Sequence, residues 1–239
     1  MYKRQHKLSA KTLEIYFPEG WKASDSRPVA VAFKKTGNNY WHRHAENYLA
    51  RGMVVVLAYS FNQKEKHSSN MSEVIGYIRG ESRKLGIDTD KVIAQTGNPH
   101  SIPLISLVTC HVASTPAKNM PNAVIIFSPG FVKYRKNLKC DIAAGITGRT
   151  PKTFLIYGGQ EVPEINYGQT LQKAYKKAGV AFGSHVFPDQ EQHFFSNDEW
   201  PDRTIDRAIK FLESHDFFTK VTDPKKLQPL SPKKSKNKK

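Results

Sequence analysis

The chain alternates short apolar runs with longer amphipathic stretches. Several apolar runs are nearly continuous and β-branched, as in residues 54–57 (Val-Val-Val-Leu), which is typical of strands buried on both faces of a parallel sheet. We predict strands at residues 13–17, 28–33, 53–59, 91–95, 123–127, 153–157 and 180–187. We predict helices at residues 41–51, 72–85, 101–112, 167–178 and 200–214. This alternation predicts an open, mostly parallel α/β sheet with helices on both faces.

The same pattern predicts how the chain is divided. Residues 13–17 alternate apolar and polar side chains, which suits an edge strand, whereas residues 91–95 are expected near the middle of the sheet. No linker or internal repeat interrupts the body of the chain. We therefore predict an N-terminal extension over residues 1–11, one domain over residues 12–220 and a basic tail over residues 221–239.

Composition adds one unusual feature, which is charge. With 239 residues, 38% of them hydrophobic, the chain is long enough for one sizeable core, but its formal net charge is +16. Residues 221–239 contain seven lysines and one aspartate and no periodic apolar positions, so we predict a disordered tail. No nucleic-acid-binding motif accompanies the tail. We expect it to make only weak, non-specific contact with polyanions.

The sequence also bears on compartment and on cysteine chemistry. The longest apolar runs are too short to span a bilayer, so no membrane span is expected. The basic N-terminus is followed by no apolar segment of the kind found in export signals, which predicts a cytoplasmic protein by default. Cys110 and Cys140 lack the spacing of metal ligands. We predict two buried thiols rather than the single bridge that they are able to form, and we expect no metal and no cofactor.

Six stretches of the chain, taken in order, resemble the α/β-hydrolase superfamily, and in particular the bacterial esterase/lipase-like branch that includes acetylxylan-esterase-like proteins. They are residues 13–22, 50–55, 85–92, 121–127, 154–159 and 193–195. The resemblance spans residues 12–214 and implies a three-layer α/β-hydrolase-like fold. Although relatives of this kind are often exported, this chain shows no signal for export.

The resemblance implies a catalytic apparatus of four parts: a serine in a Gly-x-Ser-x-Gly turn, a histidine, an acid and two oxyanion-binding N–H groups. His193 stands at the place of the family's histidine. Glu161 is the natural substitute for the family's acid, and we expect it, or Gln160, on the far side of His193. An exposed glutamate that only aids solubility is the alternative for Glu161.

The nucleophile is missing from this pattern. Residues 96–100 read Thr-Gly-Asn-Pro-His, so Asn98 takes the place of the serine, and an amide is no useful nucleophile. Pro99 has no N–H and removes the first oxyanion donor. Lys34, Lys35 and Gly37 lie in a loop that replaces the family's His-Gly-Gly-Gly. A structural explanation of the turn is stronger than a catalytic one, because asparagine favours the N-cap and proline the first turn of a helix.

No other side chain is an obvious replacement for the serine. Ser101 falls inside the first helical turn, Ser128 ends a strand where the family usually has no catalytic group, and Cys110 is expected in the middle of a helix on a buried face. We therefore reject all three as nucleophiles.

What remains at the predicted pocket is positively charged. The helix that follows residue 98 offers N–H groups and a dipole, and an anionic ligand there would be held by Lys34, Lys35, Gly37, Pro99 and His100. The alternative for the two lysines is that they merely point into solvent.

The sequence thus supports three hypotheses of unequal strength. The first is an esterase/lipase-like pseudoenzyme with a degenerate catalytic triad, which binds a small anionic or ester-like ligand, or a partner, in the remnant pocket. The alternative is an active carboxylic-ester hydrolase with a rearranged site around His193. The third and weakest is a nucleic-acid-associated module that depends on the basic tail.

Overall fold

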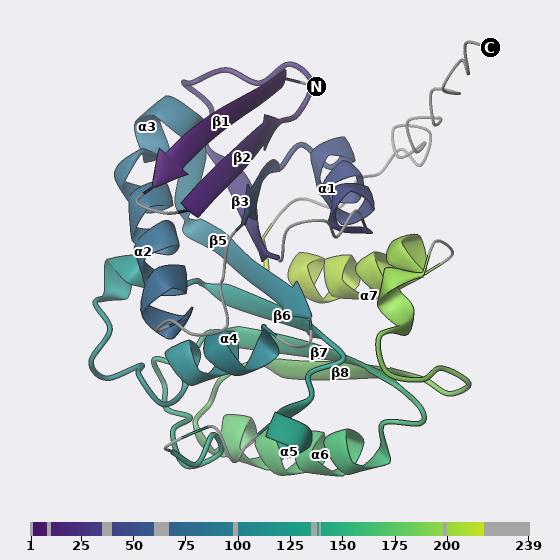
Figure 1. Ribbon diagram of the computed structural model, residues 1–239. Helices are drawn as coiled ribbons and strands as arrows, with labels where there is room; N and C mark the ends of the chain where they lie inside the picture. The colour runs from purple at the N-terminus through teal and green to yellow at the C-terminus, as the bar shows by residue number, and fades with distance from the viewer. Residues whose placement is uncertain are drawn as a thin grey trace, which may run out of the picture.

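The computed structural model describes residues 2–8, 11–34, 40–59, 67–97, 100–134, 138, 140–197 and 200–217. Within these residues eight strands form one sheet in the order β1-β2-β4-β3-β5-β6-β7-β8 (Figure 1). The strands are β1 (Tyr2–Leu8), β2 (Lys11–Phe17), β3 (Arg27–Phe33), β4 (Val54–Ala58), β5 (Ile87–Gly97), β6 (Ala123–Phe127), β7 (Lys152–Gly158) and β8 (Phe182–Phe187). All pairs from β4 to β8 are parallel, whereas β2 is antiparallel to both β1 and β4. The mostly parallel sheet with residues 91–95 near its middle is confirmed.

Helices cover both faces of the sheet and produce three layers (Figure 1). They are α1 (Tyr40–Ala50), α2 (His67–Gly80), α3 (Ser82–Leu85), α4 (Ser101–Val108), α5 (Phe131–Tyr134), α6 (Val162–Lys177) and α7 (Pro201–Glu213), with short 3-10 turns η1 (Ala117–Asn119) and η3 (Phe194–Ser196). Apolar side chains of α1 and α7 pack on one face, and those of α2, α4 and α6 pack on the other. No helix among the described residues has both the length and the apolar character needed to cross a membrane.

The protein has two hydrophobic cores, one on each face of the sheet. They follow from the alternation of side chains along each strand. On β5, for example, Val92 and Ala94 join the core under α2, α4 and α6, whereas Ile93 joins the core under α1 and α7. Because both faces of the central strands are covered, these strands are apolar at consecutive positions. The continuous apolar runs of the sequence are therefore explained by this sandwich of layers.

The N-terminal edge of the sheet differs from the prediction. Residues 13–17 are not at the edge, because β1 pairs antiparallel with β2 over the full length of both strands. Residues 2–8, expected in an extension before the domain, thus form the outermost strand. Their polar sequence did not predict a strand, because an edge strand that is covered on one face only has few positions that require apolar side chains.

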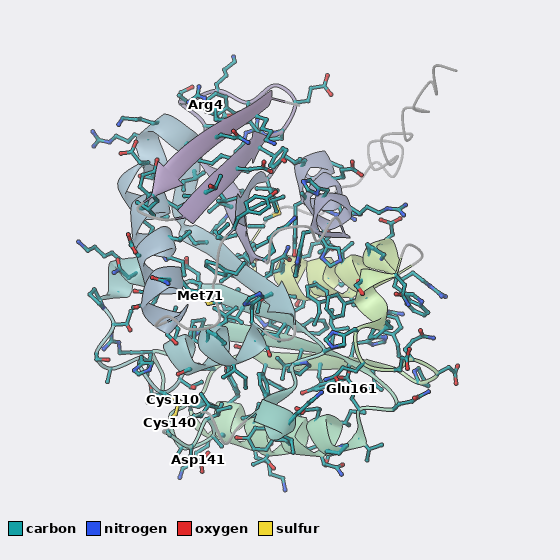
Figure 2. All side chains as sticks on the ribbon, viewed as in Figure 1. Arg4, Met71, Cys110, Cys140, Asp141 and Glu161 are labelled. Atoms are coloured by element: carbon teal, nitrogen blue, oxygen red, sulfur yellow. A yellow bond between two sulfur atoms is a disulfide. The ribbon has the colours of Figure 1, made fainter. Side chains whose placement is uncertain are left out.

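The two cysteines also differ from the prediction of buried thiols, which is wrong. Cys110 and Cys140 form a disulfide, with their Cα atoms 6.0 Å apart (Figure 2). The helix that was expected to continue to residue 112 ends at Val108, where the backbone of Thr109 leaves the helical region. Cys110 therefore lies in the turn after α4 rather than on a buried helix face, and Cys140 is exposed.

A buried carboxylate on β2 holds the edge strand in place. Glu14 Oε1 accepts hydrogen bonds from Lys3 Nζ at 2.7 Å and from Gln5 Nε2 at 3.2 Å, both on β1. Its Oε2 accepts from the hydroxyls of Tyr16 at 2.7 Å and Tyr59 at 2.6 Å. Burial alone would raise the pKa of Glu14, but the four hydrogen bonds outweigh it and lower the pKa to about 2.

Replacing Glu14 with glutamine is expected to destabilise the protein by about 2 kcal/mol at pH 7, because an amide cannot accept all four hydrogen bonds. The pKa of Glu14 is about 2 in the folded protein, against an ordinary pKa of 4.5. The contribution of its carboxylate to the free energy of unfolding is therefore fully present above pH 4.5 and is lost as the pH falls toward 2. Urea unfolding from pH 7 to pH 2.5 measures this. Equal acid sensitivity of the variant and the native protein would contradict it, and the exposed Glu19→Gln is the control.

Candidate functional site

The predicted site residues lie at the carboxyl edge of the sheet, where α/β proteins bind ligands. β5 ends at Gly97, and the His100 N–H donates to the Gly97 carbonyl at 2.9 Å in the turn before α4. α4 begins at Ser101, within two residues of Pro99 as expected, but the N-cap position is held by His100 and not by Asn98. The side chains of Asn98 and Pro99 themselves, like Lys35 and Gly37 of the other loop, lie outside the described residues. A strand is thus followed within a few residues by a helix at this point of the carboxyl edge.

Aromatic side chains fill the space under this turn. A Cβ at Gly97 would overlap the ring of Phe195, which is buried and stacks beside Phe127 with ring centroids 5.5 Å apart. Trp41 of α1 packs against the same two rings at 5.8 and 6.4 Å. The segment that carries His193 is consequently anchored by its own neighbour Phe195 directly beneath the β5–α4 turn.

His193 begins the turn η3 in a left-handed backbone conformation, with φ 70°. Its main-chain N–H donates to the Ser128 hydroxyl oxygen at 3.2 Å, while the residue as a whole is exposed. Burial of the ring, together with the charge of Lys133, lowers the pKa of His193 below its ordinary 6.5, although Glu191 opposes this. This environment therefore favours the neutral form of the His193 imidazole.

Glu161 follows β7 and is buried, with 5% of the residue exposed. Its Oε2 accepts the Gly158 N–H at 2.7 Å. Burial raises the pKa of Glu161 to about 7, although the Gly158 N–H, the Ser128 hydroxyl and the Gln192 amide lower it in part. The exposed glutamate considered as an alternative is thus excluded. Among the described hydrogen bonds none joins Glu161 to the His193 ring, and the carboxylate whose charge acts on that ring is Glu191.

Ser128 connects the segment that carries His193 with the segment that carries Glu161, a role that the sequence did not predict. It follows β6, is fully buried, and has a strained left-handed backbone with φ 45°. Its hydroxyl lies between the main-chain N–H of His193 and the carboxylate of Glu161. Its place at the carboxyl end of a buried strand was the one available signal. The connection itself links residues that are 65 positions apart.

Lys34 and His100 are both buried, although the sequence predicted that they would line a positively charged pocket. Lys34 is 1% exposed, and its ammonium lies over the Tyr59 ring, 4.7 Å from the centroid. Burial lowers the pKa of Lys34 to about 8, with Glu14 acting in the opposite direction. His100 is buried as well. Lys34 therefore does not point into solvent, because the carboxylate of Glu14 and the tyrosine ring hold its charge inside the protein.

Within the described residues, no group of three or more His, Cys, Asp or Glu side chains is arranged to hold a metal ion.

Together, the strand order and the helices on both faces of the mostly parallel sheet match a three-layer α/β-hydrolase-like fold, in which residues 100, 161 and 193 follow β5, β7 and β8. Solved structures of a thermophilic esterase from the Planctomycetes species Thermogutta terrifontis, esterase 2, share it. The native enzyme is 20% identical over 93% of this chain and 95% of its own, with a TM-score of 0.76.

Two ligand-bearing structures of the same esterase agree with this comparison. The butyrate-bound form gives a TM-score of 0.75 at 20% identity, over 92% of this chain and 96% of that chain. The form phosphorylated by paraoxon gives 0.74 at 21% identity, over 92% and 96%. No family model and no curated protein matches the sequence. At this level of identity the likeness establishes the fold.

Proposed function

We propose that this protein is a non-catalytic homologue of the α/β-hydrolase esterases, which binds a small anionic or ester-like ligand, or a partner, at the carboxyl edge of its sheet. The observation that carries the proposal is the turn between β5 and α4. It has the position and the helix start of a nucleophile turn, but asparagine and proline occupy residues 98 and 99. A strand–turn–helix of this kind keeps a binding edge while lacking the chemistry.

Two losses at this turn affect separate parts of the reaction. Asn98 offers an amide nitrogen whose lone pair is delocalised, so no covalent acyl intermediate can form on it. Pro99 has no N–H, so it cannot stabilise an oxyanion, and the loss of one such donor alone costs roughly 10²–10³ in kcat. The residues of a catalytic triad act as a unit, so the loss of the nucleophile alone removes most of the rate.

The described hydroxyls near the turn give no support to a substitute nucleophile. Ser101 is fully buried and its hydroxyl donates to the Pro129 carbonyl. Ser128 is fully buried and holds the His193 N–H. Cys110, the third candidate, is in the disulfide. A nucleophile has to reach the substrate, and none of these three side chains is free to do so.

One observation favours the alternative, an active ester hydrolase rearranged around His193. The residue is exposed, and its lowered pKa leaves the imidazole neutral and able to accept a proton at pH 7. In the non-catalytic protein the same imidazole serves binding as a neutral hydrogen-bonding group, which suits an ester-like ligand, while the charges of Lys133 and Glu191 beside it oppose each other.

Hydrolysis of p-nitrophenyl butyrate and labelling by a fluorophosphonate probe test the proposal. We expect no turnover above a buffer control and no labelling of the native protein. Asn98→Ser alone is expected to stay inactive, because Pro99 still lacks the N–H. Asn98→Ser with Pro99→Ala is the smallest change expected to give any labelling, and His100→Gly is the next change to add. Turnover by the native protein that is lost in His193→Ala would overturn the proposal and establish the rearranged hydrolase.

A further inference from the structure

A cleft of about 360 Å³ opens beside Glu161, between α5, the start of α6 and the loop that follows β8. His193 and the described residues of the β5–α4 turn do not line this cleft, which opens at the same edge of the sheet but beside the loops that follow β7 and β8. Its volume is within the range of small-molecule sites in proteins. Figure 2 places the labelled Glu161 between the ribbons of β8 and α6.

The walls of the cleft are acidic, which is unexpected in a protein with a net charge of +16. Glu161, Glu164 and Glu191 line it, against the single ammonium of Lys133. The Glu164 carboxylate accepts the main-chain N–H groups of Val132 at 2.9 and 3.1 Å and of Lys133 at 3.2 Å. Glu164 is therefore engaged in holding α5, which leaves Glu161 and Glu191 to interact with a ligand.

Glu161 is placed to receive a hydrogen-bond donor. Only 5% of Glu161 is exposed, and the residue lines the cleft. Its Oε2 is taken by the Gly158 N–H, but Oε1 is buried and makes no hydrogen bond of normal geometry with any described residue. Side-chain hydrogen bonding from Ser128 and Gln192 to the carboxylate lowers the pKa of Glu161 only in part, and burial still raises it overall. A buried carboxylate oxygen of this kind is costly unless a donor reaches it.

We propose that this cleft binds a primary alkylammonium compound, with the ammonium between Glu161 and Glu191 and the alkyl chain along Val132 and Pro163. An ammonium suits the site better than a guanidinium, because a guanidinium fork needs two carboxylate oxygens and one is already occupied. A metal ion is not favoured, because no described group of three side chains is arranged to hold one. The proposal holds whether or not the protein hydrolyses esters.

A two-dimensional ¹H–¹⁵N NMR titration of the full chain with n-butylammonium chloride at pH 8 tests this proposal. At this pH, above its pKa of about 7, Glu161 is mostly ionised. A ligand of about five heavy atoms is expected to bind with a Kd of about 1–10 mM, and the saturable shifts should centre on residues 132–133, 160–164 and 190–192. n-Butanol and sodium butyrate, matched in ionic strength, should give no saturable shifts there, and butylguanidinium should bind more weakly.

Two variants with opposite expected effects separate electrostatic recognition from structural damage. Glu191→Gln should weaken butylammonium binding by about fivefold, whereas Lys133→Gln should strengthen it by a similar factor, because each removes one rim charge. Glu19→Gln removes an exposed carboxylate far along the chain and should change nothing. The proposal is overturned if butylammonium fails to saturate these resonances by about 50 mM, if butanol binds as well, or if Lys133→Gln weakens binding as Glu191→Gln does.

Discussion

Replacing Gly159 with alanine is expected to destabilise the folded protein by about 3 kcal/mol. A Cβ at this position would overlap the carbonyl oxygen of Pro188 and lie 2.6 Å from its carbonyl carbon. These are main-chain atoms of a loop tied to β8, since the Gln190 N–H donates to the Phe187 carbonyl at 3.2 Å and the Gly159 N–H to the same oxygen at 2.8 Å. The clash can be relieved only by moving the whole loop.

Urea unfolding measures the loss for Gly159→Ala, and the NMR resonances of residues 190–193 should shift in the same variant, because this loop carries His193. Gly80→Ala is the matched control. A Cβ at Gly80 would meet nothing within 4 Å, so alanine at the end of α2 should leave stability unchanged or raise it by up to about 1 kcal/mol. Similar stabilities for both variants would show that the loops after β7 and β8 are not packed as described.

The second large effect is expected at Glu161. Because burial raises its pKa from an ordinary 4.5 to about 7, the folded protein binds more protons than the unfolded chain between these values, and stability falls as the pH rises through that range. A shift of this size corresponds to about 3 kcal/mol. Glu161→Gln removes the charge and keeps an oxygen to accept the Gly158 N–H. The variant should therefore be about 3 kcal/mol more stable than the native protein at pH 8 and nearly equal to it at pH 4.5.

Free energies of unfolding at pH 4.5, 6 and 8 decide this prediction. The dependence is opposite in sign to that of Glu14, whose lowered pKa stabilises the fold above pH 4.5, so the two carboxylates can be separated by their pH ranges. Glu19→Gln again serves as the exposed control. A difference between Glu161→Gln and the native protein that is the same at all three pH values would show that the carboxyl group does not titrate near pH 7.

The opposite behaviour of Glu14 and Glu161 illustrates how far a site can be predicted from sequence. Both are glutamates at strand or loop positions with no distinguishing local motif. The pKa of Glu14 is lowered because four hydrogen-bond donors from β1, β2 and the residue after β4 converge on its carboxylate. The pKa of Glu161 is raised because the effect of burial exceeds that of the hydrogen bonds from its neighbours. Neither environment could be predicted from the sequence, because the residues that create it come from several segments of the chain.

Local sequence determined most of the architecture. The apolar runs of β3 to β7 and the start of α7 were predictable, because burial on both sheet faces requires consecutive apolar residues, and because proline favours the first turn of a helix. The identities of Asn98 and Pro99 also carry the chemical argument on their own, since an amide and a missing N–H behave the same way in any fold.

Only the tertiary structure decided the remaining features. The sequence pattern did not indicate that residues 2–8 form the outer strand or that the ammonium of Lys34 lies over Tyr59, and it left the Cys110–Cys140 bridge as the less favoured of two possibilities. The Ser128 link to His193 and the acidic cleft at Glu161 belong to the same group. Each depends on contacts between distant segments, and a local pattern records which residues are buried but not which of them meet.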